Sequence, residues 1–244
     1  MRIIKVNNYE EMSRQAALLL AAQITLKPDS VLGLATGSTP EGMYQLLTEW
    51  HQNGCLDFSK VRTVNLDEYK GLPGTDANSY RYFMDVHLFR HINIKAENTY
   101  VPDGMAEDPE EECRRYEKII ETFGGIDLQL LGLGHDGHIG FNEPSDHFEL
   151  ETHVVKLADS TIQANARLFD SAEQVPKEAV TMGIRSIMQS RRVLLLISGQ
   201  DKAKILKQAL FGPVTPEVPA SILQLHKKLT VVADEAALTE TVLS

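Results

Sequence analysis

The feature that most constrains the fold is a regular alternation of short apolar, β-branched runs with amphipathic segments along the 244 residues. Strands that alternate with helices build βαβ units, in which neighbouring strands run parallel and helices cover the sheet. The sequence therefore predicts an α/β protein with an open, mostly parallel, Rossmann-like sheet and helices on both faces. The apolar runs are 31–34, 61–66, 126–133, 153–157, 193–197 and 229–233.

The segments between several of these runs have the spacing of helices. In the clearest one, 108–123, acidic side chains fill the first turn and an apolar stripe follows, as expected for a helix with a buried face. Glycines follow it at positions 124 and 125, and glycine commonly ends a helix. Because no repeat or linker divides the chain, we expect one domain over residues 1–244. The expected helices are 10–26, 41–52, 108–123 and 202–210.

Charge and apolar patterning exclude several classes of partner. The net charge of −10 argues against nucleic acid, which needs a basic face. A phosphorylated small molecule stays possible, because distant charges are screened beyond about 8 Å at physiological salt. No apolar run approaches the roughly 18 residues of a membrane span, and no signal peptide opens the chain. We therefore expect a cytoplasmic protein in which Cys55 and Cys113 are reduced core thiols.

One expected strand end carries a hydroxyl- and glycine-rich segment that leads into a helix. Here Thr36, Gly37, Ser38 and Thr39 precede Pro40. Glycine lets the backbone approach a ligand, and a helix N-terminus attracts anions. The segment matches neither the P-loop nor the dinucleotide pattern. It is interpreted either as a phosphate-binding loop or as a hydroxyl-capped helix start.

A second expected strand ends in the carboxylate of Asp67. A carboxylate at that place can take a proton from a carbon beside a carbonyl or imine. The alternative is a helix cap or a solvated turn residue. The adjacent Glu68 is expected to be solvated, although two neighbouring acids can raise the pKa of one of them.

The third strand end is the glycine-rich segment 131–144. It offers His138 with two candidate carboxylate partners, Asp136 and Glu143. A carboxylate on one ring nitrogen fixes the tautomer and raises the basicity of the other. A metal site built from His135, His138 and Asp136 is the competing interpretation, but two histidines three residues apart in a glycine loop are weak evidence for one.

Together these segments resemble the glucosamine-6-phosphate deaminase family. The resemblance continues through three later segments of the chain, and the segment 134–144 is its most specific part. The matching segments are 35–40, 65–69, 134–144, 163–167, 179–184 and 219–224.

The resemblance implies an enzyme of amino-sugar metabolism that converts glucosamine 6-phosphate and water to fructose 6-phosphate and ammonia, classed as a hydrolase, without cofactor or metal. It implies that His138, oriented by Asp136 and Glu143, opens the sugar ring, and that Asp67 moves the C2 proton to C1. The residues that it assigns to substrate binding are Thr36, Gly37, Ser38, Thr39, Gly132, Gly137, Arg167 and Lys202.

The segment after Pro144 departs from the family members that are activated hexamers. Where those members use hydroxyl and basic residues for a phosphate effector, 145–153 contains three acids, which would repel one. The chain also lacks their longer tail. We therefore expect a non-allosteric monomer or low-order homo-oligomer, with a possible lid over about 144–175.

Two alternatives stay open at this point. One is a sugar-phosphate lactonase or isomerase on the same scaffold, although lactone hydrolysis needs no acid at C2. The other is a sugar-phosphate sensor without turnover, although no basic helix-turn-helix segment accompanies the domain.

Overall fold

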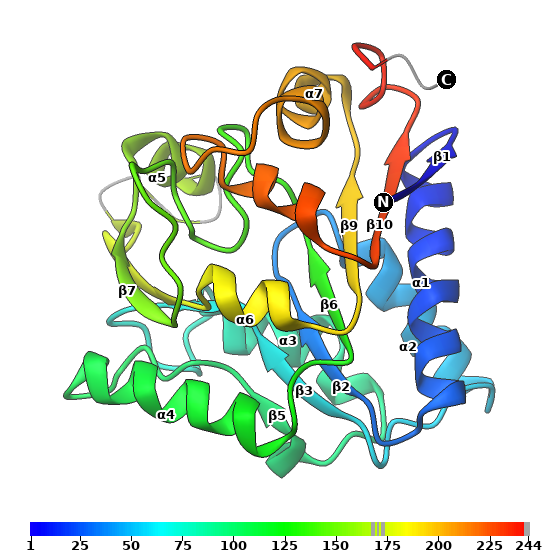
Figure 1. Ribbon diagram of the computed structural model, residues 1–244. Coiled ribbons are helices and arrows are strands. Elements are labelled where there is room, and N and C mark those ends of the chain that lie inside the picture. The colour runs from blue at the N-terminus through cyan, green and yellow to red at the C-terminus, as the bar shows by residue number, and fades with distance from the viewer. Residues whose placement is uncertain (167–168, 170, 172–173, 242–244) are drawn as a thin grey trace.

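The larger sheet has seven parallel strands in the order β1-β10-β9-β6-β2-β3-β5 (Figure 1). This arrangement comes from a computed structural model that describes residues 1–166, 169, 171 and 174–241. It confirms the predicted open parallel sheet. The strands are β1 (Arg2–Val6), β2 (Val31–Leu34), β3 (Arg62–Asn65), β5 (Thr99–Tyr100), β6 (Leu128–Leu131), β9 (Val193–Ile197) and β10 (Leu229–Asp234).

Helices cover both faces of this sheet, as predicted. The first crossovers proceed along the sheet toward β5 and the later ones return toward β10. Since such crossovers are right-handed, α1, α2 and α3 cover one face and α4, α6 and α7 the other (Figure 1). The helices are α1 (Tyr9–Leu26), α2 (Glu41–Gln52), α3 (Tyr80–His87), α4 (Pro109–Thr122), α5 (Asp159–Asn165), α6 (Ile184–Gln189) and α7 (Ala203–Phe211), with 3-10 turns at Phe89–His91, Ala96–Asn98, Gln200–Lys202 and Pro219–Leu225.

The side chain of Asp108 explains where α4 begins. The Asp108 carboxylate accepts the N–H groups of Glu110 and Glu111 at 3.0 Å, and Pro109 occupies the first turn of α4. Such caps satisfy N–H groups that the helix itself leaves without a partner. The expected helix 108–123 is therefore confirmed, with Asp108 as its cap.

A second sheet has three antiparallel strands in the order β4-β8-β7. The expectation that the run 153–157 joins the parallel sheet is wrong, because β7 pairs with β8 instead. Its side chains are only partly buried, whereas strands of a parallel sheet are buried on both faces. The strands are β4 (Asp67–Tyr69), β7 (His153–Lys156) and β8 (Glu178–Thr181).

The remaining expectations about the surface have mixed outcomes. Among the described residues no helix is long and apolar enough to cross a membrane. Both cysteines are free, and Cys113 is buried as expected, but Cys55 is exposed. The expected lid, 144–175, contains β7 and α5 together with residues outside the described part, and its movement stays a prediction.

The connections locate the place where a ligand can bind. The chain leaves β2 toward β3, but it leaves the adjacent β6 in the opposite direction, toward β9. In open α/β sheets the crevice for ligands lies at such a switch point, beyond the carboxyl ends of the strands. The segments after β2 and β6 are the hydroxyl-rich loop and the glycine-rich loop.

Candidate active site

One cavity of about 570 Å³ is lined by residues from all three of the strand ends singled out in the sequence, 35–39, 66–67 and 132–141. The segments after β2, β3 and β6 all contribute to its wall, so residues far apart in the sequence meet here. The residues that line it are Ala35, Thr36, Gly37, Ser38, Thr39, Leu66, Asp67, Tyr80, Gly132, Leu133, Gly134, His135, His138, Gly140, Phe141, Thr161, Ser198, Asp201 and Lys202.

The loop 35–40, between β2 and α2, is held in place by two tyrosines. Tyr44 donates a hydrogen bond to the carbonyl of Ala35 at 2.7 Å, and Tyr9 donates one to the carbonyl of Ser38 at 2.9 Å. Gly37 has φ of +88°, a backbone conformation that favours glycine. The loop is therefore held by contacts within the protein itself.

Of the two basic residues assigned to the substrate, the structure describes one. Lys202 lines the cavity, and its Nζ donates to the carbonyl of Leu133 at 2.9 Å. Arg167 lies outside the described residues. The ammonium of Lys202 thus supplies a cation on the side of the cavity that faces the loop after β6.

The glycines of the second loop have different roles. Gly132 lines the cavity, and the space that a side chain would take there is open. A side chain at Gly134 would lie within 2.4 Å of the His138 ring, so the close approach of the ring requires glycine. Gly137 is not among the lining residues, and its φ of +92° is a conformation that favours glycine; its expected role in substrate binding stays a prediction.

His138 lies between the two carboxylates predicted for it. Its Nδ1 is 2.7 Å from Oδ1 of Asp136 and 3.6 Å from Oε2 of Glu143. Both contacts are ion pairs without the alignment of a good hydrogen bond. Burial lowers the pKa of His138, but the two carboxylates outweigh it and raise that pKa to about 9. Asp136 and Glu143 do not line the cavity themselves.

The same three side chains are the group of described residues that can hold a metal ion, with ligand atoms within 4.8 Å of one another. An imidazolium carries a proton on each nitrogen and cannot ligate a metal, and the raised pKa of His138 favours that form. The alternative set with His135 is wrong, since its Nε2 lies 2.7 Å from Asp201 and its ring is exposed. The arrangement suits proton transfer better than metal binding.

Asp67 enters the cavity from the first residue of β4 and is 6% exposed. Burial and the neighbouring Glu68 charge raise the pKa of Asp67 to about 8, against the opposing effect of His138. The influence of His138 on this pKa shows that the two side chains share one electrostatic environment. A carboxyl group tuned toward neutral pH is suited to taking and returning a proton.

Three features of the site were not predicted. Glu68 is not solvated but 2% exposed. Tyr80 lines the cavity at the start of α3, and Thr161 lines it from α5 and donates to Oε1 of Glu143 at 2.6 Å. The sequence signals only that a helix can begin at Tyr80, because Ser79 before it is a good helix cap; it does not signal that Tyr80 lines the cavity.

Fold and site together define the class of protein: a doubly wound α/β protein whose switch-point cavity joins a hydroxyl-rich loop to groups that can transfer protons. The chain belongs to the family of glucosamine-6-phosphate isomerases/6-phosphogluconolactonase, whose model matches residues 7–232. The resemblance inferred from the sequence is thereby confirmed.

Individual relatives agree with this assignment. The chain is 60% identical over 232 residues to a protein of Lachnoclostridium phytofermentans named glucosamine-6-phosphate deaminase, covering 95% of this chain and 98% of that one. It is 55% identical to a protein of the same name from Clostridioides difficile, over 97% of this chain and 95% of the relative.

Among solved structures, the chain is more similar to a deaminase than to a lactonase. A structure described as a monomeric glucosamine-6-phosphate deaminase superposes with a TM-score of 0.96 at 49% identity, over 98% of this chain and all of the other. The 6-phosphogluconolactonase from Trypanosoma cruzi superposes with a TM-score of 0.78 at 24% identity, over 99% of this chain and 97% of the other. The second likeness shows a shared fold alone.

Proposed function

We propose that this protein is a glucosamine-6-phosphate deaminase, which converts glucosamine 6-phosphate and water to fructose 6-phosphate and ammonia. The observation that carries the proposal is that Asp67, His138 and the loop 36–39 all line one cavity. Its volume of about 570 Å³ is in the range of small-molecule sites. The names of relatives at 49–60% identity support the same substrate.

The first step is the opening of the sugar ring at His138. Because its raised pKa makes His138 an imidazolium near neutral pH, the ring first donates a proton to the ring oxygen O5 and then accepts the proton of the O1 hydroxyl. Asp136 and Glu143 stabilise the imidazolium before and after these two transfers. They act through His138, consistent with their position behind the ring and outside the cavity wall.

The second step is proton transfer at carbon by Asp67. Its carboxylate takes the C2 proton of the open-chain sugar, which gives an enolamine, and returns a proton to C1. The resulting imine at C2 adds water and loses ammonia, which leaves the ketone of fructose 6-phosphate. The isomerisation is therefore the catalysed chemistry, and "hydrolase" describes only the overall stoichiometry.

The phosphate is assigned to the loop after β2, together with Lys202. Thr36, Ser38 and Thr39 supply hydroxyl groups there, and α2 begins directly after the loop. Hydroxyls, backbone N–H groups and a helix N-terminus form a suitable environment for a phosphate dianion.

A direct assay tests the proposal. Purified protein with glucosamine 6-phosphate is expected to release ammonia and fructose 6-phosphate in equal amounts, and a deuterium label at C2 is expected to appear partly at C1 of the product. Hydrolysis of 6-phosphogluconolactone without release of ammonia would support the lactonase alternative. Tight binding of the amino-sugar phosphate with no turnover would support a sensor.

We also propose a cytoplasmic, non-allosteric monomer or low-order homo-oligomer. A relative at 49% identity is described as monomeric. The acids expected to repel an effector have partners, since His147 lies between Asp146 and Glu149 and Arg185 pairs with Glu151. Their repulsion is therefore weaker than the sequence indicated. A sigmoidal rate curve that N-acetylglucosamine 6-phosphate makes hyperbolic, or a hexamer in sedimentation, would contradict this part of the proposal.

A further inference from the structure

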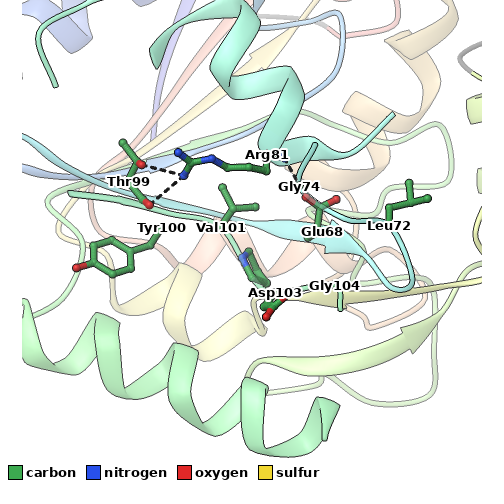
Figure 2. Close-up of a pocket in the computed structure, with 10 residues that line it drawn as sticks. Glu68, Leu72, Gly74, Arg81, Thr99, Tyr100, Val101, Asp103 and Gly104 are labelled. Atoms are coloured by element: carbon green, nitrogen blue, oxygen red, sulfur yellow. Dashed lines mark hydrogen bonds between the residues drawn. The ribbon is translucent and has the colours of Figure 1, made fainter. Parts of the chain in front are cut away.

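Glu68 is a buried acid that the mechanism above does not use. It is the middle residue of β4, and side chains alternate between the two faces of a strand. Asp67 therefore points into the active-site cavity. Glu68 lines a second cavity of about 220 Å³, which Figure 2 shows. Two adjacent carboxylates thus lie on opposite sides of one thin strand.

The Glu68 carboxylate binds the start of α3. Its two oxygens accept the backbone N–H groups of Tyr80 and Arg81, each at 2.9 Å, and that of Tyr69 at 2.8 Å. Ser79, the N-cap of α3, accepts the backbone N–H of Tyr82 in the same first turn. A carboxylate at this place is stabilised by the helix dipole. Within the described part of the chain Glu68 forms no ion pair with a cationic side chain. Burial raises the pKa of Glu68 to about 7, against the effect of these three N–H groups, so the side chain carries its negative charge above about pH 7.

Both ends of this connection reach the active site. Tyr80, the first residue of α3, lines the cavity beside Asp67. Its hydroxyl lies 3.3 Å from that of Tyr69, and its ring stacks on Phe141 at 5.9 Å between centroids. Displacement of the helix start would therefore move a part of the cavity wall that faces the reacting carbons.

We propose that Glu68 is a positioning residue for the reaction, which fixes Asp67 and Tyr80 relative to each other and places a negative charge behind Asp67. This inference rests on the proposed role of Asp67. The other titratable or charged groups around the pair are His138 and Tyr80 on the active-site side, Asp103 and Arg81 in the second cavity, and Tyr116 from α4.

Glu68→Gln tests the electrostatic part, because the amide keeps one acceptor oxygen and loses the charge. With a neutral neighbour, Asp67 ionises at lower pH, so the acid limb of kcat/KM is expected to shift down by about one pH unit. The loss of one N–H partner is expected to lower the plateau kcat by about tenfold. A purely structural role would lower the rate without moving the limb, and that result would overturn the proposal.

Glu112→Gln is the matched control. Glu112 is also a buried acid that accepts a backbone N–H, from Asp103 at 2.8 Å, but it pairs with Arg115 and comes from α4. Its replacement is expected to leave the acid limb in place. An equal shift in both variants would show a general charge effect and overturn the assignment to Glu68.

Glu68→Asp keeps the charge but shortens the side chain, and it decides the case if Glu68→Gln does not fold. It is expected to keep the acid limb within about 0.3 pH unit while kcat falls about tenfold, since the shorter group reaches the helix start less well. Full kcat would overturn the positioning role. Asp67→Asn in the same assay separates the proposed role of Asp67 from that of Glu68. If Asp67→Asn stays active, the proposed function of Asp67 is wrong. If it is inactive while the acid limb of Glu68→Gln is unmoved, only the inference about Glu68 is wrong.

Discussion

The loops that follow β2 and β6 lie side by side at the switch point of the sheet, but they differ in chemistry. The loop 35–40 contains hydroxyls and backbone groups and is held by hydrogen bonds from Tyr9 and Tyr44. The loop 132–143 holds a histidine between two carboxylates, and the neighbouring Asp67 has a pKa raised by burial and by Glu68 to about 8. One loop can hold a dianion without titrating, and the other can exchange protons.

This difference teaches that binding and chemistry are built on separate strands here. Changes around β2 are expected to act on substrate affinity, whereas changes around β4 and β6 are expected to act on the chemical step and its pH dependence. The cavity joins the two, so a change that affected both equally would show that the separation is incomplete. The predictions below test the comparison in order of expected effect.

The largest effect is expected on the chemical side, from Asp67→Asn. Loss of the group that moves the C2 proton should lower kcat by about 10³-fold, with KM changed only a few-fold. The native pKa of Asp67 is raised by burial and Glu68 above its unfolded value, so ionisation costs stability increasingly as pH rises from about 4 to 8. The variant should therefore unfold at higher temperature than the wild type at pH 8.

Steady-state kinetics and thermal unfolding of one preparation measure both effects. A variant that lost activity and stability together would indicate misfolding. A variant with near-normal kcat would remove Asp67 from the mechanism and with it the assignment of chemistry to this side of the cavity.

Most of the main sheet could be predicted from the sequence, because its central strands are continuous apolar runs. The strand 193–197 was found with its exact bounds, since every residue in it is buried. The strands β4 and β5 have three and two residues, too few for a periodic pattern. The run 153–157 was assigned to the wrong sheet because a pattern of side chains does not reveal its partner.

The candidate site was predictable where its residues follow apolar strands. Asp67 and His138 were found this way, and their meeting follows from strand order. Tyr80, Thr161 and the burial of Glu68 depend on how α3, α5 and β4 pack, which no local pattern encodes. The assignment of Gly137 to the substrate stays a prediction, because a glycine that shapes a turn and one that touches a ligand look alike in sequence.

On the binding side, Lys202→Met is expected to raise KM by about 10- to 100-fold with kcat within a few-fold of the wild type. The reason is the loss of one charge-assisted contact to the phosphate. Lys204→Met, on an exposed position in α7 two residues after Lys202, is the matched control and should leave KM unchanged. If Lys202→Met lowered kcat and not affinity, the phosphate would lie elsewhere in the cavity.

Asp136→Asn tests the ion pair behind the histidine through its pH dependence. Burial lowers the pKa of His138, but Asp136 and Glu143 raise it to about 9, above its unfolded value. The ion pair between His138 and these carboxylates therefore stabilises the folded protein fully below about pH 6.5, and this contribution is lost as pH rises through 9. Burial raises the pKa of Asp136, but His138 outweighs burial and lowers that pKa. The stability that the Asp136 carboxylate contributes is therefore lost only in strong acid.

Urea denaturation at pH 6 and at pH 9.5 measures this effect. The variant is expected to be less stable than the wild type by about 1–2 kcal/mol at pH 6, with a smaller difference at pH 9.5. An equal difference at both pH values would show that Asp136 supports the loop by its backbone contact alone, which is its acceptance of the His138 N–H at 3.1 Å.

The smallest effects are expected from two buried tyrosines, Tyr44 on the binding side near the end of β2 and Tyr116 on the chemical side near the end of β3. Tyr44 donates to the carbonyl of Ala35 after β2, and Tyr116 donates to that of Asn65 at the end of β3, both at 2.7 Å. Either change to phenylalanine leaves a buried carbonyl with one partner fewer and should cost about 1 kcal/mol of unfolding free energy. Because the stability costs match, kinetics decide: Tyr44→Phe should raise KM a few-fold, and Tyr116→Phe should lower kcat a few-fold. The same kinetic change in both variants would mean that the two sides respond as one unit.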